Sequence, residues 1–232
     1  CEQARDELHA DAIVFPELSL TGYPPEDLLL RPHFIEHAEL AMASLCSDIT
    51  GITAIIGYPL QQLGKLYNVA GVIQEGTIAI YRKQHLPNYS VFDEQRYFTA
   101  GSEPCVVRIR DVPVGITVCE DIWDAAPAAQ AAAADAQLLI NLNASPFHAG
   151  KHDEREHLLA GRARQAGIPM MYVNLVGGQD ELVFDGASFV VDRAGQVAMR
   201  APACESGLYP VDFAVADVVT PVAGDCAQPL PD

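Results

Sequence analysis

Three residues whose side chains could act together in catalysis each follow an apolar run of the sequence. Glu17 comes after "AIVFP", Lys83 after "TIAIYR" and Cys119 after "VGITV". Glutamate and lysine are seldom fully buried unless they are paired. Their position directly after apolar runs therefore predicts that the three side chains lie where buried strands end at a polar pocket.

These three residue types fit acyl transfer from an amide. A free thiol has a pKa of about 8.5 and is mostly protonated at neutral pH, so a nucleophilic cysteine needs a base or a cation beside it. Glu17 could take the thiol proton from Cys119 and later return it to leaving ammonia. The ammonium of Lys83 could stabilise the oxyanion of the tetrahedral intermediate. The trio therefore predicts cysteine-dependent amide chemistry.

Each of the three residues, taken alone, also has an ordinary structural explanation. Glu17 could cap a turn, Lys83 could be a charge at a sheet edge, and Cys119 could be a small core residue. A silent scaffold domain is a further alternative, although all three positions are filled. A redox sensor would need a second cysteine near Cys119, and the sequence does not show which thiols are neighbours.

Alternating strands and helices must position these residues. Strand-like runs occupy residues 12–15, 53–59, 66–74, 77–83, 104–110, 112–118, 137–145 and 169–177, and a hairpin follows over 187–201. Apolar spacing predicts helices from Glu26 to about Asp48, over 125–136 and from Lys151 to Gln165. This order predicts a mixed α/β domain with buried strands. The opening "EQARDELHAD" is typical of the end of a helix, so we expect a strand before it to be missing.

Charge and cysteine usage exclude several classes of protein. With 31 acidic and 14 basic residues, the net charge of −17 argues against nucleic acid and against an anionic membrane surface as partners. No apolar run approaches the roughly 18–20 residues that span a bilayer. The six cysteines form no close pairs, which is typical of free thiols in a cytoplasmic protein. His148, His152 and His157 lie in a charged segment, so we expect a solvated face and no metal site.

Longer stretches around the trio resemble a known family. "FPELSLTGY", "YRKQHLPNYSVFDEQRYF" and "VCEDIWD" resemble the Glu, Lys and Cys blocks of the nitrilase superfamily of carbon–nitrogen hydrolases. "TGYPPEDLLLRPHF", "KLYNVAGVIQ", "INLNASPFHAGK" and "VNLVGGQDELVFDGASFV" are similar to the glutaminase domain of glutamine-dependent NAD synthetases. The resemblance covers about residues 10–215 and implies an α-β-β-α sandwich.

The resemblance also implies a role for each site residue. Glu17 is implied to be the general base, Lys83 the oxyanion stabiliser and Cys119 the nucleophile that forms a γ-glutamyl thioester. Glu94 matches a second glutamate that supports the lysine and the substrate. The implied substrate-binding residues are Tyr89, Glu120, Ser145, Phe92 and Trp123. Core packing remains the alternative for the two aromatic residues Phe92 and Trp123, and a salt bridge near the pocket remains the alternative for Glu120.

The same resemblance implies a domain arrangement and partners. Residues 1–219 are expected to form the glutaminase domain, and residues 220–232 a tail toward a C-terminal synthetase domain that this chain lacks. The implied substrate is L-glutamine. The implied partners are the ammonia-accepting synthetase domain and further copies of the chain in a homo-oligomer. No cofactor is expected here, since ATP and Mg belong to the synthetase domain that amidates deamido-NAD. An ω-amidase, a carbamoylase or a nitrilase would share the trio but have a different pocket.

Overall fold

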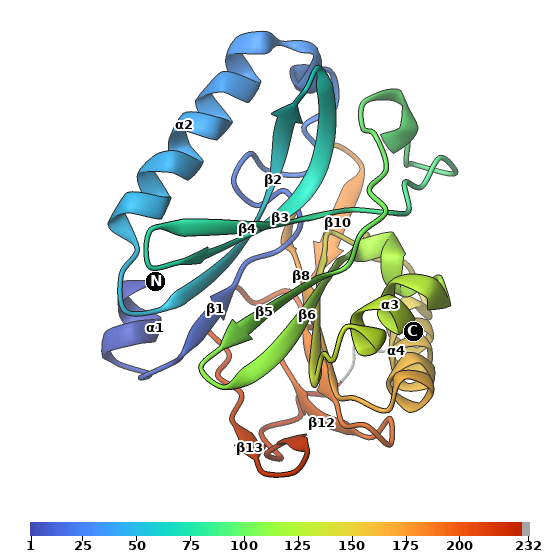
Figure 1. Ribbon diagram of the computed structural model, residues 1–232. Coiled ribbons are helices and arrows are strands. Elements are labelled where there is room, and N and C mark those ends of the chain that lie inside the picture. The colour runs from blue at the N-terminus through green and yellow to red at the C-terminus, as the bar shows by residue number, and fades with distance from the viewer. Residues whose placement is uncertain (229–232) are drawn as a thin grey trace.

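Two β-sheets packed face to face form the centre of the protein, with helices on the outer side of each sheet (Figure 1). The computed structural model describes residues 1–228. The first sheet has the strand order β1-β2-β3-β4, and the second has the order β12-β11-β8-β7-β6-β5. This arrangement confirms the predicted α-β-β-α sandwich.

The first sheet is built from two hairpins and one parallel strand. Its strands are β1 (Ala12–Val14), β2 (Thr53–Gln62), β3 (Lys65–Gln74) and β4 (Thr77–Arg82). β1 is parallel to β2, whereas β2–β3 and β3–β4 are antiparallel. Glu75 and Gly76 form the turn between β3 and β4, with a positive φ at both residues as tight hairpins require. β1 and β4 consequently run in the same direction, and the residues that follow them lie at the same end of the sheet.

The second sheet supplies a parallel centre. Its strands are β5 (Cys105–Ile109), β6 (Val112–Val118), β7 (Leu138–Asn143), β8 (Met170–Asn174), β11 (Phe189–Val191) and β12 (Val197–Arg200). β6, β7 and β8 are parallel to one another, and β5 and β11 pair antiparallel at either side. Parallel strands need long crossovers, and here helices fill them. The carboxyl ends of β6 and β7 therefore open at a common edge.

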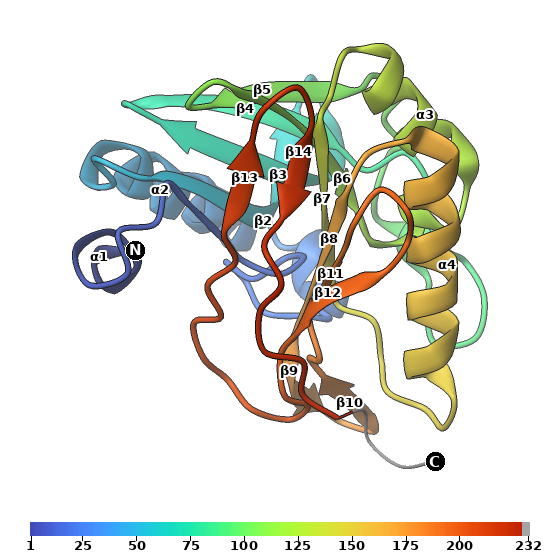
Figure 2. The same cartoon turned by 90° about the horizontal axis from the view of Figure 1, so that it is seen from below.

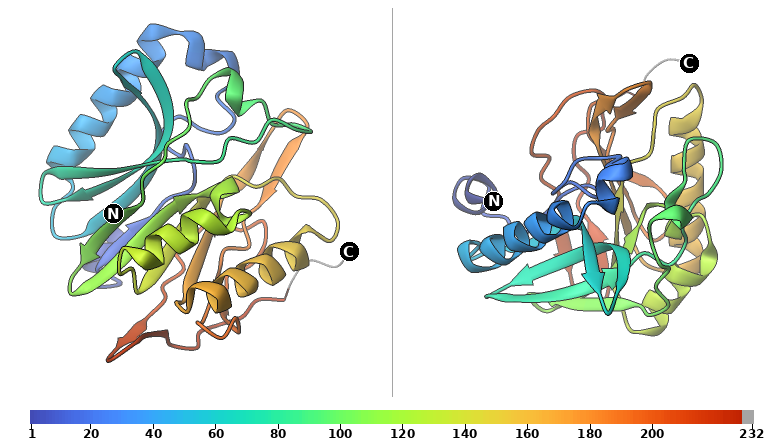
Figure 3. Two further views of the ribbon diagram at one scale, coloured as in Figure 1. Left: turned by 45° about the vertical axis from the view of Figure 1, so that its right-hand side comes forward. Right: turned by 90° about the horizontal axis from the view of Figure 1, so that it is seen from above.

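Helices cover both outer faces, as the views in Figure 2 and Figure 3 show. α2 (Pro32–Asp48) packs on the first sheet, and α3 (Ala125–Ala133) and α4 (Lys151–Ala166) pack on the second; α1 (Glu2–Asp6) opens the chain. The prediction of one helix from Glu26 was wrong. A 3₁₀ helix, η1 (Glu26–Leu30), ends at Arg31, which is extended (ψ 111°) because the residue before a proline is disfavoured in the α region.

Aliphatic side chains from both sheets fill the space between the layers. Ile55 and Val72 of the first sheet meet Val118, Ile140 and Leu142 of the second, and all are buried. Full burial of each such side chain contributes about 1.5–3 kcal/mol. The strand ends that carry the predicted site residues are therefore fixed to one another through this core.

Two hairpins were not predicted from the sequence. β9 (Val176–Gln179) pairs with β10 (Leu182–Asp185), and β13 (Phe213–Val215) pairs with β14 (Val219–Pro221). Beyond β14, the amide of Ala227 still donates to the carbonyl of Arg200 over 3.0 Å. The domain boundary at residue 219 stays a prediction, and residues 229–232 of the predicted tail lie outside the described residues. Among residues 1–228, no helix has the length and apolarity to cross a membrane.

Candidate active site

Glu17, Lys83 and Glu94 form a buried charged cluster. The Nζ of Lys83 lies 2.7 Å from Oε1 of Glu17 and 2.7 Å from Oε1 of Glu94. Glu17 and Lys83 are fully buried, and Glu94 is 7% exposed. Glu17 follows β1 and Lys83 follows β4. Because these strands run in the same direction, both residues lie at the same end of the sheet. Glu94 begins η2 (Glu94–Arg96).

Both sheets orient the carboxylate of Glu17. Its Oε1 accepts a hydrogen bond from Nδ2 of Asn68 on β3 over 2.7 Å, and its Oε2 accepts one from the amide of Ala144 over 3.2 Å. Ala144 directly follows β7 of the second sheet. Because the first sheet contributes Lys83 and Asn68 and the second contributes Ala144, the position of Glu17 depends on how the two sheets dock.

The charges of this cluster are strongly coupled. Burial acts to lower the pKa of Lys83, but Glu17 and Glu94 outweigh it and hold that pKa well above its usual value. Lys83 therefore stays an ammonium. Burial raises the pKa of Glu94 to about 7; Lys83 opposes the shift and the charge of Glu17 adds to it. Within residues 1–228, Oε2 of Glu94 has no hydrogen-bond partner.

Cys119 ends β6 and begins the 3₁₀ helix η3 (Cys119–Ile122). Its φ of +46° lies in the left-handed region, which is unfavourable for a residue with a Cβ by about 1–2 kcal/mol. Strain of this kind is often found at functional sites. Burial, with the charge of Glu17, raises the pKa of the Cys119 thiol well above its usual value, although Lys83 opposes the shift. The thiol is therefore protonated at neutral pH and needs a base to react.

Asp121 holds the turn that carries Cys119. Its buried carboxylate accepts four hydrogen bonds, from the amides of Val118 (3.0 Å), Gln84 (3.0 Å) and His85 (2.8 Å) and from the hydroxyl of Tyr81 (2.8 Å). Gln84 and His85 directly follow Lys83. Asp121 thereby ties the end of β4 to the cysteine turn, and a role for it was missed in the sequence analysis.

The predicted substrate-binding residues Tyr89, Phe92 and Glu120 lie together near the surface. The hydroxyl of Tyr89 is 2.9 and 3.0 Å from the two carboxylate oxygens of Glu120, and the rings of Tyr89 and Phe92 meet edge to face at 5.7 Å. Residues 84–89 line a pocket of about 550 Å³ together with Gln95, Ala100 and Glu120. Phe92 is partly buried and packs against an apolar cluster, and its role at the substrate stays a prediction.

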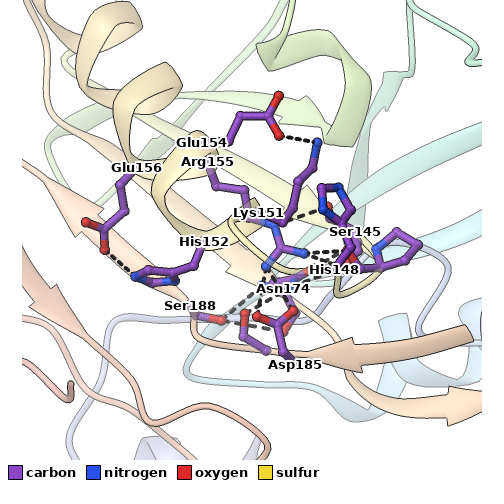
Figure 4. Close-up of polar contacts among 12 residues, drawn as sticks. Ser145, His148, Lys151, His152, Glu154, Arg155, Glu156, Asn174, Asp185 and Ser188 are labelled. Atoms are coloured by element: carbon purple, nitrogen blue, oxygen red, sulfur yellow. Dashed lines mark hydrogen bonds and ion pairs between the residues drawn. The ribbon is translucent and has the colours of Figure 1, made fainter. Parts of the chain in front are cut away.

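Trp123 and Ser145 lie on other segments. Nζ of Lys151, at the start of α4, is 4.1 Å from the centre of the Trp123 ring. Ser145 is 7% exposed and follows Ala144, the residue whose amide reaches Glu17. Figure 4 shows Ser145 within a polar network that also contains Arg155, Asn174 and Asp185. The structure thus brings a cation to the predicted substrate-binding Trp123, which the sequence analysis did not foresee.

Several of the missed residues share one property. Asn68, Asp121 and Arg155 are polar side chains at most 1% exposed, and they lie in β3, in the turn of Cys119 and in α4. An asparagine in the middle of the strand run "KLYNVAGVIQ" was the one available signal, because buried polar groups need partners. Among residues 1–228, no three His, Cys, Asp or Glu side chains lie together in a way that could hold a metal ion.

Comparisons with known proteins identify relatives along the whole described chain. The family model for carbon–nitrogen hydrolase matches residues 1–220. A glutamine-dependent NAD(+) synthetase from Xanthomonas campestris pv. campestris is 49% identical over 217 residues, which are 92% of this chain and 39% of that protein. The chain thus spans about two fifths of the length of this relative.

Solved structures agree with this match. Glutamine-dependent NAD+ synthetase from Acinetobacter baumannii superposes with a TM-score of 0.92 at 37% identity, over 99% of this chain and 44% of that one. A variant of the amidase from Nesterenkonia sp. AN1, which carries the acetamide moiety of fluoroacetamide on its active-site cysteine, superposes with a TM-score of 0.74 at 26% identity, over 84% of this chain and 74% of that one. This chain belongs to the carbon–nitrogen hydrolase family.

Proposed function

We propose that this chain is the glutaminase domain of a glutamine-dependent NAD synthetase, with Cys119 as its nucleophile. The observation that carries the proposal is the buried pair of Glu17 and Lys83, held 2.7 Å apart, whose charges both act on the pKa of the Cys119 thiol. A base, a fixed cation and a thiol at one place are the groups that amide hydrolysis requires.

Acylation begins when Glu17 takes the thiol proton of Cys119. The sulfur attacks the carbonyl carbon of the glutamine side-chain amide, and the ammonium of Lys83 stabilises the negative charge on the oxygen. The C–N bond then breaks as protonated Glu17 gives its proton to the leaving nitrogen, which departs as ammonia. A γ-glutamyl thioester on Cys119 remains.

Deacylation uses the same groups in the same order. Glu17, again a carboxylate, takes a proton from water, whose oxygen attacks the thioester carbonyl. The C–S bond breaks, the proton passes from Glu17 to the Cys119 thiolate, and glutamic acid leaves. One glutamine and one water thus give one ammonia and one glutamic acid, whose γ-carboxyl then releases its proton, and the protein returns to its starting state.

Polar residues on the segments that carry Cys119 and Ala144 suit the two ends of the glutamine zwitterion. The carboxylate of Glu120, already bonded to Tyr89, matches the α-ammonium. Lys151, which lies over the ring of Trp123 and pairs with Glu154 at 2.9 Å, and the hydroxyl of Ser145 match the α-carboxylate, which needs donors. Phe92 and Trp123 then cover the apolar stem of the substrate.

The ammonia would be used by a domain outside this chain. In the proposed whole protein, that domain amidates deamido-NAD with ATP and Mg, and the protein assembles as a homo-oligomer. The likeness to the synthetase of Acinetobacter baumannii over 99% of this chain supports this assignment.

The test is covalent labelling of the full-length protein with 6-diazo-5-oxo-norleucine, followed by intact mass and peptide mapping. We expect one adduct, on Cys119, and protection by excess glutamine. Cys119→Ala should remove the adduct, whereas Cys105→Ala, a control in β5 of the same sheet, should keep it. An adduct at another cysteine would contradict the assignment of Cys119. Protection by short aliphatic amides and none by glutamine would favour an amidase like that of Nesterenkonia.

A further inference from the structure

Arg155 is a fully buried guanidinium on α4 that the proposed chemistry does not use. It is 1% exposed, and its Nη1 lies 2.9 and 3.0 Å from the two carboxylate oxygens of Asp185, at the end of β10. A buried charge of this kind is retained only when it is paired and fully hydrogen-bonded. The direction in which its remaining donors point therefore indicates what the pair does.

Those donors converge on Ser145. The Nε–H of Arg155 donates to Oγ of Ser145 over 3.2 Å, and Nη2 donates to the carbonyls of Ser145 (2.8 Å) and Pro146 (2.9 Å), as Figure 4 shows in part. Asn174 completes the arrangement, because its Oδ1 accepts the amide of Ser145 over 2.9 Å. The amide, the carbonyl and the hydroxyl oxygen of Ser145 all have fixed partners.

This arrangement also sets the polarity of the Ser145 hydroxyl. A serine hydroxyl has one donor hydrogen and can accept through its oxygen lone pairs. Because Arg155 has no acceptor atom and can only donate to Oγ, the hydroxyl hydrogen must point away from the guanidinium. Ser145 is thus presented as a donor, and the neighbouring buried hydroxyl of Tyr172 competes with the substrate for this hydrogen. It follows Ala144, whose amide bonds to Glu17, so the backbone of Ser145 lies next to the residue that contacts the candidate base.

We propose that Arg155, held by Asp185, is a positioning residue that presents the Ser145 hydroxyl as a hydrogen-bond donor to an anionic oxygen of the substrate, the α-carboxylate of glutamine. The inference rests on the proposed function, since it takes glutamine to be the substrate. It adds that recognition depends on an ion pair that does not itself touch the substrate.

A double-mutant cycle in the full-length protein tests this idea. The variants are Arg155→Lys, Ser145→Ala and their combination, with Asp185→Asn as a second way to loosen the guanidinium without changing its own side chain. Lysine keeps the charge but cannot reproduce the planar set of donors. Three quantities are measured: kcat and KM for glutamine, the rate at which iodoacetamide alkylates Cys119, and Tm.

The control is Glu156→Gln, one residue along the same helix. Glu156 pairs with Arg200 at 2.6 Å, so its loss removes a partly buried ion pair that has no bond to Ser145. We expect this variant to lower Tm and to leave both kcat/KM and the alkylation rate unchanged.

We expect Arg155→Lys to raise KM and to lower kcat/KM for glutamine by about tenfold to a hundredfold, the loss typical of a displaced binding group. Iodoacetamide does not need the α-carboxylate subsite, so alkylation of Cys119 should keep its rate within about threefold. The kcat/KM of the combined variant should lie within about threefold of the kcat/KM of the less active single variant, because both changes remove the same donor.

Multiplicative losses in the combined variant, or an unchanged KM in folded Arg155→Lys, would overturn the proposal. If Arg155→Lys does not fold, Asp185→Asn is judged by the same criteria. A wild-type protein that does not hydrolyse glutamine would instead refute the proposed function, and the cycle is then run with the amide that it does hydrolyse.

Discussion

Tyr81 and Asp121 connect the two sheets beside the candidate nucleophile. The hydroxyl of Tyr81 donates to Oδ2 of Asp121 over 2.8 Å, and both side chains are buried. Tyr81 belongs to β4, and Asp121 lies in the turn after β6. The two residues after Lys83 and the turn of Cys119 are therefore bonded to the same carboxylate.

Replacing Asp121 by asparagine should disrupt that connection. All four bonds to Asp121 come from donors, so an amide nitrogen must face at least one of them, and a buried group left unpaired costs about 1–3 kcal/mol. We expect chemical denaturation to show a loss of at least that size, with loss of glutamine hydrolysis. Asp124→Asn, at the exposed N-cap of α3, is the control and should change stability little, since asparagine caps helices as well as aspartate. Equal effects of the two changes would contradict the role of Asp121.

Lys83→Met should lower the rate of glutamine hydrolysis by about 10²–10³-fold, as expected for loss of one oxyanion donor. It also leaves the carboxyls of Glu17 and Glu94 buried without their cation. The folded state then favours the protonated form of Glu94 more than the unfolded state does, so the free energy of unfolding should fall as pH rises. Steady-state kinetics and urea unfolding at several pH values measure both effects. Lys65→Met, at an exposed position, should show neither; a rate loss of only a few-fold in Lys83→Met would remove its assigned role.

Glu17→Gln should separate proton transfer from thiol reactivity. Hydrolysis should fall by about 10²–10⁴-fold because no base remains to carry the proton to ammonia. The charge of Glu17 raises the pKa of the Cys119 thiol, so its removal should shift alkylation of Cys119 by iodoacetamide toward lower pH. The rate of alkylation against pH, followed by mass, measures the shift. Glu36→Gln on the exposed face of α2 is the control, and retained turnover in Glu17→Gln would exclude it as the base.

The pair of Glu156 and Arg200 should make stability depend on acid. Burial opposes ionisation of Glu156, but His152 and Arg200 outweigh it and lower its pKa to about 2. A lowered pKa in the folded state gives stability that is present above the unfolded pKa of 4.5 and is lost as pH falls toward 2. Wild-type protein should therefore lose about 2–3 kcal/mol more than Glu156→Gln between pH 5 and pH 2. Parallel unfolding curves for the two proteins across that range would show that the pair is not formed.

The mixed α/β order of the elements and the places of Glu17, Lys83 and Cys119 at strand ends were predictable because strand period and abrupt polar residues after apolar runs are local features of a sequence. The layers of the sandwich were implied by the family resemblance and not by these local features. The break at Arg31 was also readable from Pro32, but the apolar spacing on either side of it concealed the break. The bonds of Asp121 and Arg155 were not predictable, because their partners come from segments that only the docked sheets bring close. The short β9–β10 strands were missed since Gly177 and Gly178 weaken the strand pattern there.

The sequence distances within the cluster have a consequence for folding. Glu17 bonds to Lys83, 66 residues later, and to Ala144, 127 residues later. Contacts this far apart close late, since long loops must be ordered before the contacts form. An intermediate with one finished sheet holds a thiol but no oriented base. The return of glutamine hydrolysis during refolding should therefore lag behind the return of the strand signal in circular dichroism. The return of catalytic activity would then report when the two sheets dock.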